Sequence, residues 1–255
     1  MTSAATLDHD IVSRSEWLRA SREFLDKEKE LTRLSDELAR QRRELPWTRI
    51  EKDYVFDGPQ GKLSLTDLFG TRSQLAVYHF MFGPDWTEGC PGCSYVTDHT
   101  NGILEHLGAR DVSFVLVSRA AIDKLTAFKQ RMGWTLPWVS SGGTDFNHDF
   151  DVTVTKEEVG SRANANNSDS TPSSAKENPG LSLFFKDPSG AIFRTYSTYA
   201  RGLDALLGTY VILDRAPKGR DEGDLAMPMN WVRHHDKYEP TLQSVESCCH
   251  NKNQS

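Results

Sequence analysis

The sequence has no apolar run long enough to cross a bilayer: no stretch approaches the roughly 18–20 consecutive apolar residues that a membrane helix needs. The first ten residues contain no basic stretch followed by an apolar one, so no secretory signal is expected. Positive charge does not dominate either, because 30 Lys and Arg residues face 36 Asp and Glu residues and the net charge is −6. We therefore expect a cytoplasmic protein that binds neither membranes nor nucleic acids.

Cysteine is scarce as well, with 4 residues in a chain of 255. Four cysteines are too few for a disulfide framework in a chain of this length. They form two close pairs, Cys90 with Cys93 and Cys248 with Cys249, which indicates redox or metal chemistry. A metal site at Cys90 and Cys93 would need further ligands from His234 and His235 or from Cys248 and Cys249, because the sequence has no second Cys-x-x-Cys. We therefore expect no metal and no other cofactor.

Apolar residues are sparse in two regions of the chain. Residues 155–178 are rich in Ser, Asn, Lys and Glu and contain no aromatic residue, and the segment after Pro240 is polar. Such segments bury too little apolar area to offset the roughly 1–2 kcal/mol per residue that backbone ordering costs. The predicted organisation is a disordered N-terminus at 1–12, a helical arm at 13–46, one domain at 47–240 with a mobile insertion at 155–178, and a disordered tail at 241–255.

Residues 13–45 predict one long helix. Ser13 and Glu16 form a capping box, and no Gly or Pro interrupts the segment before Pro46. Large apolar residues recur every seven positions, but the positions that would widen this stripe are mostly small or polar. Two interpretations stay open: the helix packs across its own domain, or it forms a homodimer with a second copy. The seven-residue series is Trp17, Phe24, Leu31, Leu38 and Leu45.

The middle of the chain alternates strands and helices. A continuous apolar run at 75–80 is typical of a strand buried on both faces, and a helix is predicted from Cys90 to about Gly108. This order predicts an α/β domain with a mixed sheet and helices on both faces. The other expected elements are a hairpin at 51–59, a strand at 112–117, a helix at 120–132, a strand at 137–140, hairpin strands at 181–185 and 192–196, and a helix at 202–207.

Cys90-Pro91-Gly92-Cys93 is the motif with the clearest chemistry. With Cys90 at the N-cap, Pro91 takes the first helical position, where its missing N–H costs nothing. The positive end of the helix then favours the thiolate and lowers the pKa of Cys90. Cys93, one turn further along, is placed to attack a mixed disulfide on Cys90. The sequence thus predicts Cys90 as nucleophile and Cys93 as resolving cysteine, with the neighbouring Glu88 opposing thiolate formation.

Seven segments carry a family resemblance: Glu28-Lys29-Glu30, Arg42 to Trp47, Cys90 to Ser94, Pro137 to Ser141, Thr195 to Gly202, Pro217 to Glu222 and Trp231 to Asp236. Through them, residues 17–240 resemble a thioredoxin-like family of unknown function described as predicted dithiol–disulfide isomerases, in the thioredoxin/peroxiredoxin-like superfamily. The resemblance implies a thioredoxin-like three-layer sandwich with a mixed central sheet, a long N-terminal helix and a C-terminal extension. It also implies a cis-proline facing the cysteines, for which Pro179 fits best and Pro137 second.

Peroxiredoxins offer a competing resemblance, because they place Pro-x-x-x-Thr-x-x-Cys before a peroxidatic cysteine. Here Thr87 keeps its spacing to Cys90, but Pro84 lies one residue too close. In that interpretation Thr87 orients an oxygen of the substrate, and Arg119 or Arg194 stabilises the thiolate. His79, within the predicted buried strand, is expected to be a hydrogen-bonded core residue, with a proton acceptor near Cys90 as the alternative.

Cationic and aromatic residues concentrate in the C-terminal third. They predict either a pocket for an anionic or flat aromatic substrate beside the cysteines, or an ion-pair network through Asp204, Asp214, Asp221, Glu222 and Asp236. Cys248 and Cys249 are either an incidental exposed pair or a flexible resolving pair. The candidate pocket residues are Tyr196, Tyr199, Arg201, Arg233, His234 and His235.

Three functions follow from these patterns. The first is a thiol–disulfide oxidoreductase acting on a protein or small-molecule thiol or disulfide through Cys90 and Cys93, supported by Pro91, Thr87 and Pro179. The second is a small-molecule enzyme or binding module, for example one that modifies an aromatic metabolite, in which the cysteines are dispensable. The third is a peroxiredoxin-like peroxidase. The sequence alone fixes neither the substrate nor the direction of the redox reaction.

Overall fold

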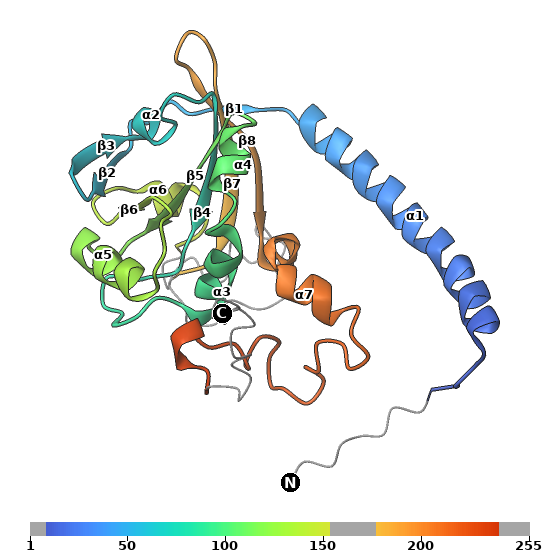
Figure 1. Cartoon of the computed structure of the whole chain (residues 1–255). Helices are drawn as coiled ribbons and strands as arrows, with labels where there is room; N and C mark the ends of the chain where they lie inside the picture. Colours follow the sequence, from blue (N-terminus) through green and yellow to red (C-terminus); the bar gives the residue numbers. More distant parts are fainter. Residues whose placement is uncertain (1–8, 154–176, 240–255) are drawn as a thin grey trace, which may run out of the picture.

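The computed structural model describes residues 9–153 and 177–239 (Figure 1). Most of the predicted disordered N-terminus, nearly all of the predicted insertion at 155–178 and the whole predicted tail at 241–255 lie outside the described residues, as do Cys248 and Cys249. Within the described part, no helix is both long and apolar enough to cross a membrane.

Helix α1 (Arg14–Glu44) begins at the residue that the capping box predicts. The Ser13 N–H donates to the Glu16 carboxylate (3.0 Å), and the Glu16 N–H donates to the Ser13 hydroxyl (3.3 Å). None of the residues of α1 is buried, and the helix projects away from the sheet (Figure 1). The interpretation that this helix packs across its own domain is therefore wrong for this structure, while the predicted long N-terminal helix is confirmed.

The strands form one mixed sheet of eight in the described part, in the order β1-β8-β7-β4-β5-β6-β2-β3. Strand β4 runs parallel to β5, and β5 parallel to β6, while the other neighbours are antiparallel. The order β8-β7-β4-β5 with these directions is that of the thioredoxin fold. The bounds are β1 (Thr48–Arg49), β2 (Val55–Gly58), β3 (Gly61–Ser64), β4 (Gln74–His79), β5 (Val112–Ser118), β6 (Trp138–Ser140), β7 (Gly180–Lys186) and β8 (Ile192–Tyr199).

Two hydrophobic cores lie on opposite faces of this sheet because successive side chains of a strand point to opposite sides. Along β4, Ala76 and Tyr78 enter one core, and Leu75 and Val77 enter the other. The first core is covered by α3 (Pro91–Thr100), α4 (Leu104–Gly108), α5 (Ile122–Arg131), the 3-10 helix η1 (Ala200–Leu206) and α7 (Gly208–Leu213); the second by α2 (Leu65–Leu68) and α6 (Phe146–Asp149). The predicted helices on both faces are confirmed.

The helix expected from Cys90 to Gly108 is interrupted. Helix α3 ends at Thr100, and α4 begins at Leu104. The Asn101 side-chain oxygen accepts hydrogen bonds from the N–H groups of Thr135 (2.7 Å) and Leu136 (3.4 Å), which ties this point of the chain to the α5–β6 loop. The break therefore comes from a tertiary contact that helix periodicity does not register.

Residues 214–239 form the C-terminal extension, whose only regular element is the short 3-10 helix η2 (His235–Lys237). This extension runs across the end of the molecule where α3 begins (Figure 1). Val232 is buried in the first core, with Met229 and Trp231 packed against it. The extension is thus packed against the domain at the end that carries the cysteines.

Candidate functional site

Cys90 lies where β4 leads through a loop into α3, at the N-cap position, with Pro91 at the start of the helix. The Cys90 N–H donates to the Met81 carbonyl (3.0 Å), and the Cys90 carbonyl accepts from both the N–H and the hydroxyl of Ser94 (2.9 Å each). Gly89 precedes it in a space without room for a side chain, because a Cβ there would lie 2.6 Å from Phe80. These contacts fix the backbone that presents the Cys90 thiol.

Cys93 is buried one turn further along α3. Its sulfur accepts a hydrogen bond from the Met81 N–H (3.4 Å), so the same residue holds the backbone of Cys90 and the sulfur of Cys93. The hydroxyl of Tyr78, from β4, hydrogen-bonds the Cys93 thiol from the sheet side. The two thiols also hydrogen-bond each other.

The environment separates the acidities of the two thiols. The hydrogen bond from the Cys93 thiol, aided by the N–H groups of Cys93 and Gly92 and opposed by burial, lowers the pKa of Cys90 to about 7. Burial, followed by the neighbouring Cys90, raises the pKa of Cys93 well above its usual range, although Tyr78 and the Met81 N–H act in the other direction. Near neutral pH, Cys90 therefore carries a substantial thiolate population and Cys93 is a thiol.

Glu88 does not act on Cys90 as the sequence led us to expect. Its carboxylate accepts hydrogen bonds from Lys237 (2.7 Å) and from Arg131, and these two cations lower the pKa of Glu88. Arg131 also forms a bidentate ion pair with Asp236, with hydrogen bonds of 2.7 and 2.9 Å. The negative charge of Glu88 is therefore compensated by two cations, and the carboxylate joins the C-terminal extension to the loop before Cys90.

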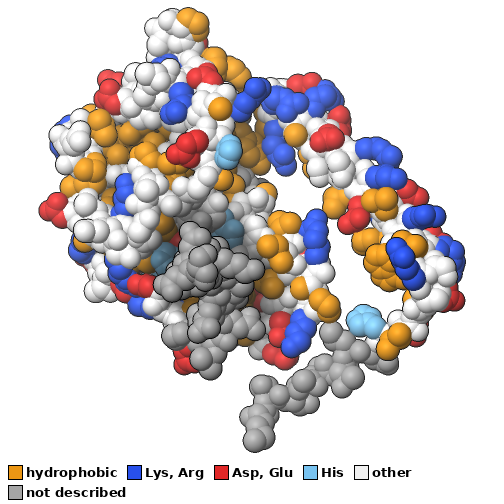
Figure 2. Space-filling model, in the orientation of Figure 1, with side chains coloured by type: hydrophobic (Ala, Val, Ile, Leu, Met, Phe, Trp, Pro, Cys, Tyr) orange, Lys and Arg blue, Asp and Glu red, His pale blue; other side chains and the backbone are white. Residues whose placement is uncertain are grey.

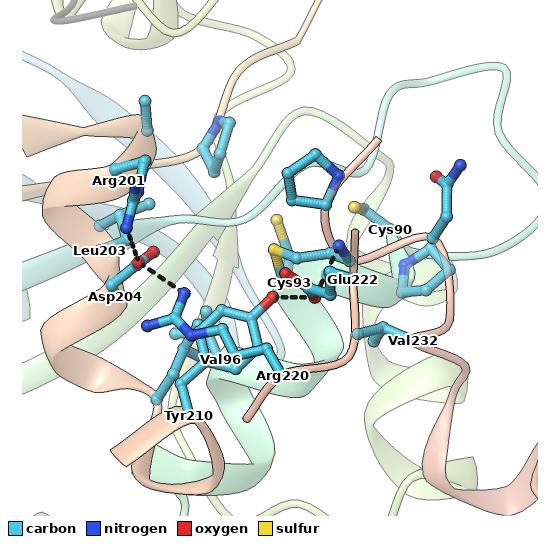
Figure 3. A pocket seen from close by; sticks show the side chains of 18 of the residues that line it. Cys90, Cys93, Val96, Arg201, Leu203, Asp204, Tyr210, Arg220, Glu222 and Val232 are labelled. Atoms are coloured by element: carbon cyan, nitrogen blue, oxygen red, sulfur yellow. Dashed lines mark hydrogen bonds and ion pairs between the residues drawn. The ribbon is translucent and has the colours of Figure 1, made fainter. Parts of the chain in front are cut away.

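A cavity of about 1090 Å³ lies beside the cysteines, between the start of α3, the η1–α7 region and the C-terminal extension (Figure 3). Most of its wall is apolar, contributed by residues such as Val96, Leu203 and Met229. The Met229 methyl lies 3.5 Å from the point where a side chain on Gly92 would begin, so the extension reaches the Cys-x-x-Cys loop. The cavity is slightly larger than the roughly 300–1,000 Å³ typical of small-molecule sites.

Charged residues of the cavity are organised by two local networks (Figure 3). Arg220 binds Asp214 through two hydrogen bonds (2.7 and 2.8 Å), contacts Asp204 (3.2 Å), and lies over the Tyr210 ring at 3.7 Å. Arg201 shares Asp204 at 3.4 Å. Part of the predicted ion-pair network is therefore present, and it forms one side of the cavity.

Glu222 belongs to the second network. One carboxylate oxygen, Oε1, accepts from the Tyr210 hydroxyl (2.7 Å), the Trp231 indole N–H (2.6 Å) and the Met229 N–H (3.0 Å). Burial favours the neutral acid, but these donors together with Arg220 prevail and lower the pKa of Glu222. Glu222 is therefore a carboxylate at neutral pH, held rigidly in the cavity wall.

The structure brings only some of the predicted site residues to this cavity. Pro91, Pro179, Arg201 and Arg233 line it together with both cysteines. Thr87 is exposed and does not line it, which removes the geometric basis for its expected contact with the substrate. The predicted pocket residues absent from its lining are Tyr196, Tyr199, His234 and His235.

These four residues have structural contacts instead. The Tyr199 hydroxyl is buried and donates to the Phe150 carbonyl (3.0 Å), and the Tyr196 ring lies under Arg42 at 5.7 Å. His235 hydrogen-bonds Asp98 (2.8 Å). Tyr196 and Tyr199 lie three residues apart on β8 and so point to opposite faces of the sheet, and His235 is exposed on the extension. Proximity in the sequence therefore does not bring these three side chains to the cavity.

His234 has a different place. It is 3% exposed, and its Nε2–H donates to the Gly89 carbonyl (2.8 Å), which leaves Nδ1 to accept from Arg131 (3.5 Å). Its ring also packs edge-on against Phe128. His234 therefore positions the loop before Cys90 rather than contacting the cavity.

Pro179 lines the cavity, as the resemblance implies, but without the expected isomer. No described peptide bond is cis, including those before Pro179 and Pro137. Glu177 bridges to Thr153, and the Asn178 N–H donates to the Val152 carbonyl (2.7 Å), so the chain approaches β7 already extended. An extended approach suits the trans bond, which is also the more stable isomer.

The accessory residues of the peroxidase hypothesis lie away from the cavity. Arg119 pairs with the buried Glu177 (2.9 Å), and Arg194 binds the hydroxyls of Ser197 (2.8 Å) and Tyr199 (2.9 Å). His79 is buried, hydrogen-bonds Ser182 (2.9 Å) and has a pKa lowered to about 3, mainly by burial. His79 is therefore the core histidine that the sequence favours, and neither arginine lines the cysteine site.

The sequence patterns did not indicate Tyr78 or Met229 as site residues, whereas Tyr210, one of the aromatic residues of the C-terminal third, does line the cavity. Tyr78 lies within an apolar strand and fits the pattern of a core residue, although a buried tyrosine hydroxyl needs a partner and so marks a polar neighbour. Met229 belongs to a segment with no periodic pattern. Among the described residues, no group of three or more His, Cys, Asp and Glu side chains is arranged to hold a metal ion.

Solved structures similar to this chain include a PrxQ mutant from Xylella fastidiosa, at 17% identity over 62% of this chain and 88% of that one, with a TM-score of 0.40. The peroxidoxin BcpB from Mycobacterium tuberculosis matches at 13% identity over 64% and 94%, with a TM-score of 0.43. A hypothetical protein from Sinorhizobium meliloti matches at 11% over 58% and 68%, with a TM-score of 0.37. The fold assignment rests on strand order and direction and not on these likenesses.

None of the curated proteins compared with this chain matches it. A protein family matches residues 6–238, a range that contains the helical arm, both site cysteines and nearly all of the described C-terminal extension. Because the match spans most of the sequence, the chain belongs to the family described as "Bacterial protein of unknown function (DUF899)".

Proposed function

We propose that this protein is a thiol–disulfide oxidoreductase that uses Cys90 and Cys93. The observation that carries the proposal is the pair of hydrogen-bonded thiols at the start of α3, with a lowered pKa on the half-buried Cys90 and a raised pKa on the buried Cys93. A dithiol needs this division of roles, because one sulfur attacks the substrate while the other is held back until the mixed disulfide has formed.

In the reducing direction, the Cys90 thiolate attacks one sulfur of a substrate disulfide and the other sulfur leaves as a thiolate. Cys93 then gives up its proton and attacks the Cys90 sulfur, releasing the second substrate thiolate and leaving a Cys90–Cys93 disulfide. The substrate gains two electrons and the enzyme dithiol loses two. Oxidation is the reverse sequence, and isomerisation combines attack and release on one substrate.

The test uses reduced protein and a model disulfide in a single turnover. We expect wild type to form the Cys90–Cys93 disulfide and release two substrate thiols. Cys90→Ser should abolish both events, and Cys93→Ser should stop at a mixed disulfide on Cys90, visible by intact mass. Unchanged thiol release by Cys90→Ser would sink the proposal.

A binding module is the second candidate, and the volume and apolar wall of the cavity favour it. The same variant distinguishes the two functions, because ligand binding in such a module survives Cys90→Ser, whereas disulfide exchange does not.

A peroxidase would instead convert Cys90 to a sulfenic acid when peroxide is added to the reduced protein, and a sulfenic-acid probe detects that product.

A further inference from the structure

Two charged side chains in the cavity retain hydrogen-bonding and ion-pairing capacity that no described residue uses. The three donors to Glu222 all bind Oε1, and no described residue donates a hydrogen bond to Oε2. The carboxylate is fixed by these bonds, so its free oxygen costs little entropy when it accepts a bond from a ligand. A fixed carboxylate in an apolar wall selects an N–H donor, and best of all a positively charged one.

Arg233 is the second of these side chains. Its Nη1 donates to the backbone carbonyls of Asn230 (2.8 Å) and Val232 (3.0 Å), which hold the guanidinium in place. Within the described residues Arg233 has no carboxylate partner, unlike the other two arginines of the cavity, Arg201 and Arg220. A guanidinium held by carbonyls keeps its positive charge available for an anion.

One residue links Glu222 to the cysteines. Met229 lies against Gly92 through its methyl group and donates its own N–H to Glu222 (3.0 Å). Met229 therefore connects Glu222 to the Cys-x-x-Cys loop. Arg233 lies four residues after Met229 in the sequence and lines the same cavity. A ligand whose sulfur reaches Cys90 meets an anion and a cation in the same cavity.

We infer that the cavity recognises low-molecular-mass disulfides of the zwitterionic, amino-acid type, with the ammonium group at Glu222 and the carboxylate at Arg233. This inference rests on the proposed function, since it names the substrate class of the same cysteines. The redox step is unchanged: the Cys90 thiolate attacks the disulfide, one amino-acid thiolate leaves, and Cys93 displaces the second. A cavity of this size accepts such a molecule, and the C-terminal extension that forms one wall sets the specificity.

The experiment measures the rate at which fully reduced protein forms its Cys90–Cys93 disulfide with four probes. Cystine carries both charges, cystine dimethyl ester only the ammonium, N,N′-diacetylcystine only the carboxylate, and bis(2-hydroxyethyl) disulfide neither. Each rate is divided by the rate of the same probe with dithiothreitol, which corrects for the intrinsic reactivity of the disulfide. We expect cystine to give the highest corrected rate.

Two variants then assign each charge to its residue. Glu222→Gln should lower the preference for cystine over N,N′-diacetylcystine by about tenfold or more, the effect of losing one charge-assisted hydrogen bond. Arg233→Gln should lower the preference for cystine over its dimethyl ester by a similar factor. Asp224→Asn and Arg215→Gln are matched controls, because they remove the same charges from the same segment outside the cavity lining, and both preferences should persist in them.

Equal corrected rates for the four probes, or variants that slow every probe by the same factor, would overturn the inference and leave the proposed function intact. Failure of every probe to oxidise the wild-type dithiol would overturn both. A preference that moves equally in the two control variants would show a general charge effect and would also contradict the assignment to Glu222 and Arg233.

Discussion

His234 donates a hydrogen bond of 2.8 Å to the carbonyl of Gly89, the residue immediately before Cys90. The two residues are 145 positions apart in the sequence. Around this contact, Arg131 joins Glu88 of the same loop to Asp236 of the extension, and Lys237 adds a second bond to Glu88. The C-terminal extension is thus a fixed part of the cysteine site.

His234→Ala should destabilise the protein and slow the reaction of Cys90. The substitution leaves a buried carbonyl at Gly89 without its partner and removes the ring that packs against Phe128, which together cost about 1–3 kcal/mol or more. Urea denaturation gives the loss of unfolding free energy, and single-turnover disulfide formation gives the rate.

The matched control for this substitution is His235→Ala. His235 is exposed and its only described partner is Asp98, so its loss should change stability by less than about 1 kcal/mol. Equal destabilisation by the two variants would contradict the positioning role of His234.

Alkylation of Cys90 should depend on pH in a defined direction. With the pKa lowered to about 7, the rate with iodoacetamide should rise with pH, reach half its maximum near pH 7 and level off about one unit higher. An ordinary cysteine reaches half its maximum near about pH 8.5. Because the Cys93 thiol is the largest cause of the shift, Cys93→Ala should move the midpoint to higher pH. A midpoint that stays in place would show that the helix terminus alone sets the acidity.

Tyr78→Phe should affect the second step of exchange more than the first. The Tyr78 hydroxyl lowers the pKa of Cys93, so its removal raises that pKa further and reduces the Cys93 thiolate by tenfold for each unit of pKa. We expect the mixed disulfide on Cys90 to persist several-fold longer, as followed by intact mass after acid quenching. Tyr54→Phe is the control, because that hydroxyl bonds Asp149 (2.7 Å) at the other core. A mixed disulfide of unchanged lifetime in Tyr78→Phe would contradict the role of the hydroxyl.

Local sequence patterns predicted the structural features that depend on residues close together in the chain. The capping box at Ser13, the apolar run of β4 and the position of Cys90 before Pro91 each depend on neighbours within a few residues, and all three occur in the structure. The composition of the C-terminal third likewise predicted charged and aromatic residues near the cysteines, although His234 binds the Gly89 carbonyl and does not line the cavity.

Long-range contacts explain most of what the sequence did not show. The break after Thr100 depends on Asn101 meeting the α5–β6 loop, and the compensation of Glu88 depends on residues that follow it by 43 and 149 positions. The cavity wall around Glu222 belongs to a segment without hydrophobic periodicity, for which pattern reasoning has no template. Such features need the fold before the partners of a side chain can be known.

The exposed face of α1 gives the last prediction, which concerns assembly. Trp17, Phe24 and Leu31 are 59%, 59% and 65% exposed, and with Leu38 they keep a seven-residue spacing that suits pairing with another helix of the same spacing. Because α1 stands clear of its own sheet (Figures 1 and 2), a second copy of this helix is the partner we expect. Light scattering after size-exclusion chromatography should give a dimer for wild type and a monomer for Phe24→Glu with Leu31→Glu. The control, Arg22→Gln with Lys29→Gln, removes two charges from the side of the helix opposite this stripe and should remain dimeric. A wild-type monomer at concentrations of about 100 μM, well above the low-micromolar dissociation constants of many specific complexes, would contradict pairing through α1.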